Sequence, residues 1–508
     1  MLAQPASKSN ETVAILPSEI NQFSAELFVE IFVLCWRSFT PPFDDIYRSG
    51  EPQDSSTTVN FEFKTEIARL AHAPLLIVAR VCRKWRSIAM GTSLLWCDIE
   101  LDSVLWASPA QRRTAFAVLE STLTRGGNSP LNITLTQRDH PIPFRVFSTL
   151  AAHSQRWETF SCPSHLIGAF SSIQDRLPRL QWLHLGISQY EPGSLDYWNS
   201  PSLPSLTSLI LGGEILGQDM RNLPLEQLRQ FECGAIDQSN MKNVMSLMPR
   251  LSPGTEFRFL VHQLDEPEDW AEIERVTSNI SIFYLHLLGD FNVDYSLKVL
   301  ECVLDAITLP CLTQFVLESL EYPCCPLLWS HRAFLALCAR SSFDCTLRTL
   351  EIYDVHITEA QLVECLSHLP SLERLAISDH QPIAPISARA GVGANEVLVT
   401  DTLLAKLTHT ADSDAPSLVP RLSSLGCQTL MHFDDRALLA LVVSRLSNNF
   451  DTGQPQDATG PQFGIELSWL PGRERKIDEA VLARLYALRI STNRRFTFRM
   501  SAAEDEWI

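Results

Sequence analysis

The sequence predicts an α/β fold in which a short helical hairpin precedes a long array of repeated units. Amphipathic helical spacing occurs twice near the N-terminus, at residues 25–35 and 74–89. From about residue 155 onward, leucine-type residues recur at relative positions one, four and six of a short frame. Helical apolar spacing, as at residues 359–369, recurs between copies of that frame. A period of 3.6 predicts helices and a period of two predicts strands, so both element types are expected.

The hairpin prediction rests on capping residues and on the spacing of apolar side chains. Ser24 can begin the first helix because its hydroxyl accepts an N–H of the first turn, and Glu26 suits the positive end of the helix dipole. Pro74 can begin the second helix, since its missing N–H costs nothing there. The apolar positions of the first helix are Leu27, Phe28, Ile31, Phe32, Leu34 and Cys35. Those of the second are Leu75, Val78, Ala79, Cys82, Trp85 and Ala89.

These segments resemble an F-box, in the form common in mushroom-type fungi. The helix at residues 25–35, the run Val81-Cys82-Arg83-Lys84-Trp85-Arg86 and the closing Leu94-Leu95-Trp96 carry the resemblance. The family usually opens with Leu-Pro-x-Glu, and this chain has Phe23-Ser24-Ala25-Glu26 at that place. An insert at residues 37–72 separates the two halves; lengthening a surface loop adds little closure entropy. The alternative interpretation is a small helical hairpin that packs under the next domain.

The resemblance implies a function and a set of partners. F-box helices dock on a Skp-type adaptor, which tethers them to a cullin ubiquitin ligase, and the appended domain captures a protein substrate. The chain would then be a substrate-recognition subunit and not an enzyme. The candidate adaptor-binding side chains are Phe23, Leu27, Ile31, Phe32, Val78, Val81 and Trp85. Some of them must instead pack the hairpin itself. An interaction or scaffold protein without a link to a ubiquitin ligase is the alternative, favoured by the altered opening.

The repeated frame has the pattern of a leucine-rich repeat. Copies begin at Leu180, Leu206, Leu312, Leu347 and Leu372, and weaker copies at Trp157, Leu228, Ile280 and Leu422. A single unit cannot bury its apolar face, so units must stack. The spacings exceed the usual ~20–29 residues, and they leave room for a missed copy near residues 248–251. The sequence therefore predicts an irregular leucine-rich-repeat solenoid (horseshoe), with a generic α/β domain of similar strands as the alternative.

The frame also assigns side chains to the two faces of each strand, because successive side chains point to opposite faces. Positions four and six should point into one core: Leu183, Leu185, Leu209, Leu211, Leu350, Ile352, Leu375 and Ile377. Position five should point outward, where we expect a protein substrate to bind. The candidates are His184, Ile210, Val316 and Glu351. Inserted loops such as residues 381–394 are the alternative cover for this face.

The expected domain organisation follows from these patterns. Residues 1–17 are predicted to be disordered, 18–109 to form the F-box-like domain with its insert at 37–72, 110–500 the repeat domain, and 501–508 an acidic tail. Further predicted helices span residues 110–123, 332–339, 437–446 and 477–490. Further predicted strands span residues 131–135 and 494–500.

Composition excludes several classes of function. The chain has 508 residues and a formal net charge of −18, which argues against a nucleic-acid or anionic-membrane surface. Its apolar runs, such as residues 75–79, are far too short to span a bilayer. The 13 cysteines contain no C-x-x-C pair and sit mostly among apolar residues, which is typical of a reduced cytoplasmic or nuclear protein.

No sequence motif points to chemistry carried by the chain itself. The P-loop, the H-E-x-x-H zinc motif and the G-x-S-x-G elbow are all missing from the sequence. We therefore predict no catalytic, cofactor-binding or metal-ligating residues, and an enzyme on an α/β fold is the least favoured class. The carboxylate pair Asp434-Asp435 stands just ahead of a predicted helix, so a helix cap is expected there rather than an acid–base pair.

Overall fold

The structure is a computed structural model that describes most of the chain with gaps. The described residues are 24–39, 79–137, 142–166, 173, 177–186, 202–212, 220, 222–235, 238–262, 273–288, 293–320, 327–379, 397–409, 418–448, 463–470, 475–492 and 496–502. The predicted disordered N-terminus, the loop at 381–394 and nearly all of the insert and tail lie outside them. The chain divides into two compact units, Met1–Arg156 (unit 1) and Trp157–Ile508 (unit 2).

The predicted fold class, a helical F-box hairpin followed by a leucine-rich-repeat solenoid, is wrong. The described strands instead define an α/β protein with one large parallel sheet of 14 strands, ordered as in the sequence. That sheet already begins at β1 (Asp98–Asp102), inside the segment expected to be a helical domain. The error has a physical source. The frame specifies short strands with two buried side chains on one face, and any parallel sheet with one face in the core meets that requirement.

Unit 1 contains the first predicted helix, the C-terminal part of the second and the first two strands. The second helix is predicted to run unbroken from Pro74 to Ala89, but Cys82 has extended backbone (φ −157°) and caps a helix that begins at Arg83. Pro74 lies outside the described residues. Its elements are α2 (Ala25–Phe39), α6 (Arg83–Gly91), η1 (Ser93–Trp96), β1, η2 (Ser103–Trp106), α7 (Pro109–Arg125), β2 (Leu131–Thr136), α8 (Phe144–Ala151) and η3 (Ser154–Arg156). Caps fix the helix starts: the Ser24 hydroxyl accepts the N–H of Leu27 at 3.4 Å, and Ser108 forms a capping box with Gln111. The predicted helix at 110–123 and strand at 131–135 are confirmed.

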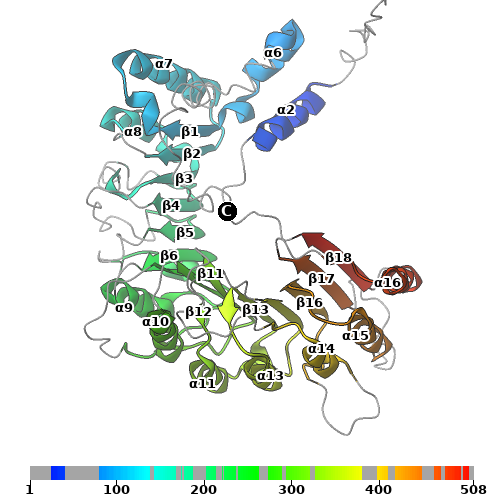
Figure 1. The fold of residues 1–508 in the computed structure, drawn as a ribbon. Helices are drawn as coiled ribbons and strands as arrows, with labels where there is room; N and C mark the ends of the chain where they lie inside the picture. Colours follow the sequence, from blue (N-terminus) through cyan, green and yellow to red (C-terminus); the bar gives the residue numbers. More distant parts are fainter. Residues whose placement is uncertain are drawn as a thin grey trace, which may run out of the picture. The chain divides into compact units, whose positions relative to one another are not determined.

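Unit 2 alternates strands of the large sheet with helices. Its strands in that sheet are β3 (Trp157–Pro163), β4 (Trp182–Gly186), β5 (Ser208–Leu211), β6 (Gln230–Ala235), β7 (Glu256–His262), β9 (Ile282–Leu288), β11 (Gln314–Leu320), β13 (Thr349–Tyr353), β15 (Arg374–Ser378), β16 (Ser424–Thr429), β17 (Phe463–Trp469) and β18 (Phe496–Ala502). Its helices are α9 (Gln238–Leu247), α10 (Val293–Ala306), α11 (His331–Ser341), α12 (Phe343–Thr346), α13 (Glu359–Ser367), α14 (Asp401–Leu407), α15 (Asp435–Asn448) and α16 (Glu479–Ser491). Helices α9 to α16 lie along one side of the strands (Figure 1).

The core of unit 2 lies between the sheet and these helices. All eight side chains predicted to point inward are at most 1% exposed, which confirms that part of the frame. Phenylalanines extend the core through the middle of the sheet, where one ring from each of the strands β6, β7, β9 and β11 lies beside the next: Phe231, Phe257, Phe283 and Phe315. Their successive ring centroids are 5.5, 5.6 and 5.8 Å apart. Aromatic pairs at such separations add to the free energy gained from burial.

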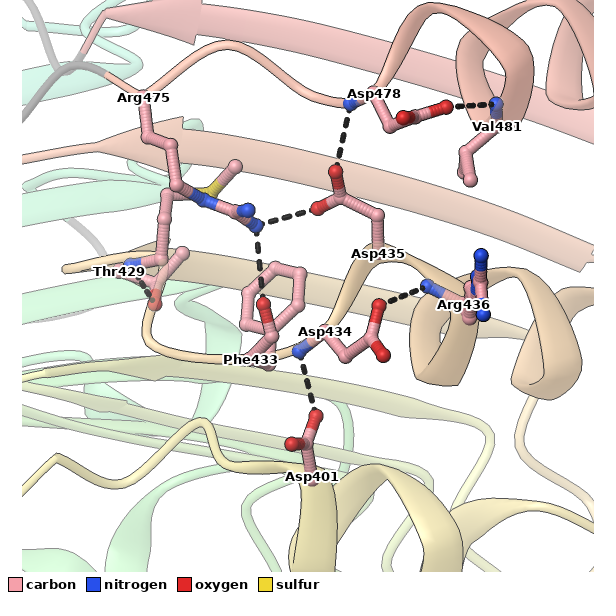
Figure 2. Close-up of polar contacts among 10 residues, drawn as sticks. Asp401, Thr429, Phe433, Asp434, Asp435, Arg436, Arg475, Asp478 and Val481 are labelled. Atoms are coloured by element: carbon pink, nitrogen blue, oxygen red, sulfur yellow. Dashed lines mark hydrogen bonds and ion pairs between the residues drawn. The ribbon is translucent and has the colours of Figure 1, made fainter.

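A ladder of hydrogen bonds joins the starts of four successive helices. The first residue of α13, Glu359, accepts the hydroxyl of Thr400, the cap of α14, at 2.5 Å. Asp401 of α14 accepts the N–H of Asp434 at 2.6 Å, and Asp435 of α15 accepts the N–H of Asp478 at 2.7 Å (Figure 2). Asp434 also accepts the N–H of Arg436 at 2.9 Å. The prediction of a helix cap at Asp434-Asp435 is therefore confirmed.

Two arginine side chains donate hydrogen bonds to backbone carbonyl groups of segments that precede them in the chain. Arg340 donates to the carbonyl of Ile307 at 3.0 Å and also to that of Leu304. Arg445 is buried and donates to the carbonyls of Leu407 and Val419, each at 3.0 Å. Burial lowers the pKa of the Arg445 guanidinium to about 10. Of these carbonyl groups, those of Leu304 and Leu407 lie at helix ends, where the helix itself leaves them without partners. Ile307 and Val419 lie outside the helices.

Among the described residues, we find no helix with both the length and the apolar character needed to cross a membrane.

Candidate functional site

Two surfaces carry the candidate functional residues, and the first is the helical pair of α2 and α6. Its core is aromatic: the rings of Phe28 and Phe32 each lie 5.3 Å from that of Trp85. The indole N–H of Trp96 donates to the carbonyl of Ala89 at 2.8 Å, which fixes the end of α6 against this core. Phe32, a predicted adaptor contact, is only 1% exposed. That prediction is wrong, because the Phe32 ring packs against Trp85 and holds the two helices together.

A second apolar stripe on α2 faces away from this core. Leu27 is 39% exposed, Ile31 36% and Leu34 65%. Successive helical residues turn by about 100°, so this stripe lies roughly a quarter-turn from Phe28 and Phe32. Val81, at 58%, and Leu94, at 60%, are also exposed in unit 1. Of the nine large apolar side chains exposed in the described part of the chain, these five lie between residues 27 and 94.

The other assigned positions on this surface fall into two groups. Trp85 is half-buried against the core of the pair. Phe23 and Val78 lie outside the described residues. Next to the stripe stands the carboxyl group of Glu26. Hydrogen bonds from its own backbone N–H and from the Ser24 side chain lower the pKa of this carboxyl, which favours its negatively charged form. A clustered apolar stripe with a charged border is the composition expected of a protein-binding surface.

The second candidate surface is the sheet face opposite the helices, across β6, β7, β9, β11, β13 and β15. We call it the open face, since the described helices lie on the other side (Figure 1). The strand register aligns position five of each frame in one row. The row begins on the neighbouring strand β5 with Ile210. From β6 to β15 it continues with Glu232, Arg258, Tyr284, Val316, Glu351 and Ala376. The predicted alignment of these positions is therefore present.

The four assigned substrate-binding residues differ in exposure. His184 is 4% exposed and Val316 3%. The prediction that these two side chains bind a substrate is therefore wrong, because neighbouring side chains cover them and leave little surface for a partner. His184 Nδ1 lies 2.8 Å from the Ser161 hydroxyl, and burial lowers the pKa of this histidine to about 4. Ile210 is half-buried. Glu351 accepts the Tyr353 hydroxyl at 3.1 Å and pairs with Arg374 at 3.2 Å.

The frame missed the polar residues that flank this row. Tyr353 and Glu318 stand two positions after the row residue of their strands, and Glu256 two positions before it. Side chains two apart share a face of a strand, so extending the frame by two residues at each end would have found them. Glu318 Oε2 lies 3.1 Å from Nδ1 of His286, and Arg258 pairs with Glu256 at 2.8 Å.

One side-chain cluster resembles a nucleophile with its base. Cys365 Sγ lies 3.6 Å from Nδ1 of His331, whose Nε2 lies 2.9 Å from Glu364. Cys365 is completely buried, and burial raises its pKa to about 12. The thiolate is the reactive form of cysteine, so this thiol stays protonated and unreactive near neutral pH. The described residues also contain no group of three side chains able to hold a metal ion.

The chain matches no protein-family model and no curated protein sequence.

Proposed function

We propose that this chain is a substrate-recognition subunit of a Skp–cullin–F-box type ubiquitin ligase. In this proposal the helical pair of α2 and α6 binds a Skp-type adaptor, which links the chain to a cullin. The α/β sheet of unit 2 binds a protein substrate. The chain itself carries out no catalysis, and the complex works in the cytoplasm or nucleus.

The observation that carries the proposal is the exposed stripe of Leu27, Ile31 and Leu34. Exposed apolar area is costly in water, at about 25 cal/mol per Å², and a stripe that persists beside a complete aromatic core is best explained by a partner that covers it. The stripe lies on the helix whose sequence, together with Val81-Cys82-Arg83-Lys84-Trp85-Arg86, resembles an F-box. The sequence resemblance and the exposed stripe thus support the same partner.

The stripe offers a test that leaves the fold intact. Ile31→Asp places a charge on the exposed stripe, whereas Ile490→Asp places one on α16, where the side chain is 81% exposed. Truncating an interface anchor typically costs ~2 kcal/mol or more of binding free energy. We expect a tagged Ile31→Asp chain to lose the adaptor and cullin from its co-purifying proteins, and Ile490→Asp to retain both. Equal recovery of the adaptor with both variants would exclude the stripe as the docking surface.

A further inference from the structure

The open face of the sheet carries an excess of negative charge. Three neighbouring rows of outward side chains cross β6 to β15, set by the register of the strands. Their charged members are four carboxylates and two guanidinium groups: Glu232, Glu256, Glu318, Glu351, Arg258 and Arg374. The surface potential of these rows is therefore negative, which favours a cationic partner and disfavours an anionic one.

Both arginines of the open face are already paired. Arg258 lies 2.8 Å from Glu256, and its guanidinium stacks 4.9 Å from the ring centre of Tyr284. Arg374 lies 3.2 Å from Glu351. A phosphate or carboxylate on a partner would have to displace these intramolecular carboxylates and approach the remaining ones. The arginines act as supports that orient the acidic side chains, and they are poorly placed to capture an anion.

Two tyrosines give the open face aromatic surface of fixed orientation. The Tyr353 hydroxyl donates to Glu351 at 3.1 Å, and the amide of Gln314 donates to the Tyr284 hydroxyl at 3.4 Å. The rings of Tyr284 and His286 are nearly parallel, with centroids 6.0 Å apart. Side chains held in place lose little entropy on binding. The Tyr353 ring lies beside the Glu351 carboxylate, so a lysine or arginine is attracted both by the ring face and by that charge. One face of the Tyr284 ring already carries the guanidinium of Arg258.

We propose that the open face binds an extended, lysine- or arginine-rich segment of a partner protein, seated across Glu318, Glu351, Tyr284 and Tyr353. This deepens the proposed function, on which it rests for the role of the segment as part of the substrate. The six strands from β6 to β15 span about 24 Å at the usual strand spacing. An extended segment of about eight residues, roughly 26 Å long, is enough to cross them.

The first test measures binding of a fluorescent peptide of about eight alternating lysines and serines to the full chain, by anisotropy at low salt. We expect Glu318→Gln together with Glu351→Gln to weaken binding at least about tenfold, because both charges are lost while the amides keep their size. The matched control is Glu364→Gln with Glu479→Gln, which removes the same charge from helices α13 and α16. Equal weakening by both pairs overturns the proposal, as does tighter binding of a glutamate–serine peptide.

A second measurement needs no variant, so it still tests the proposal if the chain with Glu318→Gln and Glu351→Gln fails to fold. A carbodiimide is used to join the lysine amines of the bound peptide to nearby carboxylates of the wild-type chain. Mass spectrometry then locates the cross-linked residues of the chain. Cross-links at Glu232, Glu256, Glu318 or Glu351 are expected; cross-links spread over carboxylates of the helices contradict the proposal. Adaptor binding is measured in parallel. If the wild-type chain binds the adaptor but not the peptide, this inference alone is overturned. If it binds the peptide but not the adaptor, the proposed function alone is overturned.

Discussion

Asp379 offers the sharpest test of how unit 2 is held together. Its side chain is completely buried at the end of β15. Oδ1 accepts the N–H groups of Leu398 and Val399 at 2.7 and 3.0 Å. Oδ2 accepts the Thr429 hydroxyl at 2.7 Å and the N–H of Leu430 at 2.8 Å. One carboxylate therefore joins the end of β15 to the end of β16 and to the segment that leads into α14.

The cost of losing this carboxylate follows from those four bonds. Asp379→Ala leaves three buried N–H groups without a partner, at ~1–3 kcal/mol each. Allowing for water that enters the vacated space, the free energy of unfolding should fall by about 3–6 kcal/mol. Asp379→Asn keeps the volume but turns one acceptor into a donor that faces other donors, so about 2–4 kcal/mol is expected. The exposed Asp344→Asn should change stability by less than ~0.5 kcal/mol.

Urea denaturation of the wild-type chain and the three variants measures these differences, provided that the slope m is unchanged. Hydrogen exchange adds a local reading, since the amides of Leu398, Val399 and Leu430 should exchange slowly in the wild type and rapidly in Asp379→Ala. An unchanged urea midpoint for Asp379→Ala, with those amides still protected, would refute the reasoning.

Three further predictions concern the core and its buried charges. Burial lowers the pKa of His184 to about 4 in the folded chain, whereas the ordinary pKa of histidine, about 6.5, applies in the unfolded chain. Between pH ~6.5 and 4, the unfolded chain therefore binds a proton at this residue and the folded chain does not. Stability should be full above pH ~6.5 and fall by up to about 3 kcal/mol as the pH drops toward 4. In His184→Gln that part of the slope should vanish, and an identical slope in both proteins argues against a buried neutral histidine. Leu350→Ala should cost ~2–5 kcal/mol in urea; a loss below 1 kcal/mol would mean that the side chain is not in the core. Arg445→Met should lower the free energy of unfolding by about 3 kcal/mol, because it leaves buried carbonyl groups without a donor. The exposed Arg436→Met should change it by almost nothing. Equal effects of the two substitutions would contradict a stabilising role for the hydrogen bonds of Arg445.

The sequence predicted local elements well because each rests on neighbouring residues. Leucines at positions four and six of the frame form buried strand residues, and the helices expected at 332–339, 437–446 and 477–490 correspond to α11, α15 and α16. The suspected copy near 248–251 exists as β7. It was hard to see because Pro253 and Gly254 lengthen the turn between Leu251 and the strand, and Gly254 adopts a φ of 89°. β17 was missed because its first buried residue is Phe463, without a leucine at position one.

The fold class and part of the candidate site could not be read from local patterns. Strand order and sheet size depend on which distant segments pair, and the frame does not contain that information. The burial of Phe32 depends on Trp85, which reaches it from another helix. The low exposure of Val316 depends on the longer side chains that stand beside it in the row, Tyr284 and Glu351. Apolar periodicity identifies the faces of an element, but only tertiary contacts decide which of those faces stays exposed.

The central claim is that the stripe on α2 is covered by a Skp-type adaptor. Hydrogen exchange of the purified full chain, measured alone and with a purified Skp-type adaptor, tests it most directly. The account predicts that the amides of Leu27 to Leu34, and those from Val81 to the start of α6, exchange more slowly in the presence of the adaptor. The strands of unit 2 should be unaffected. Formation of no complex, or a complex whose protection falls outside residues 24–96, would contradict the account.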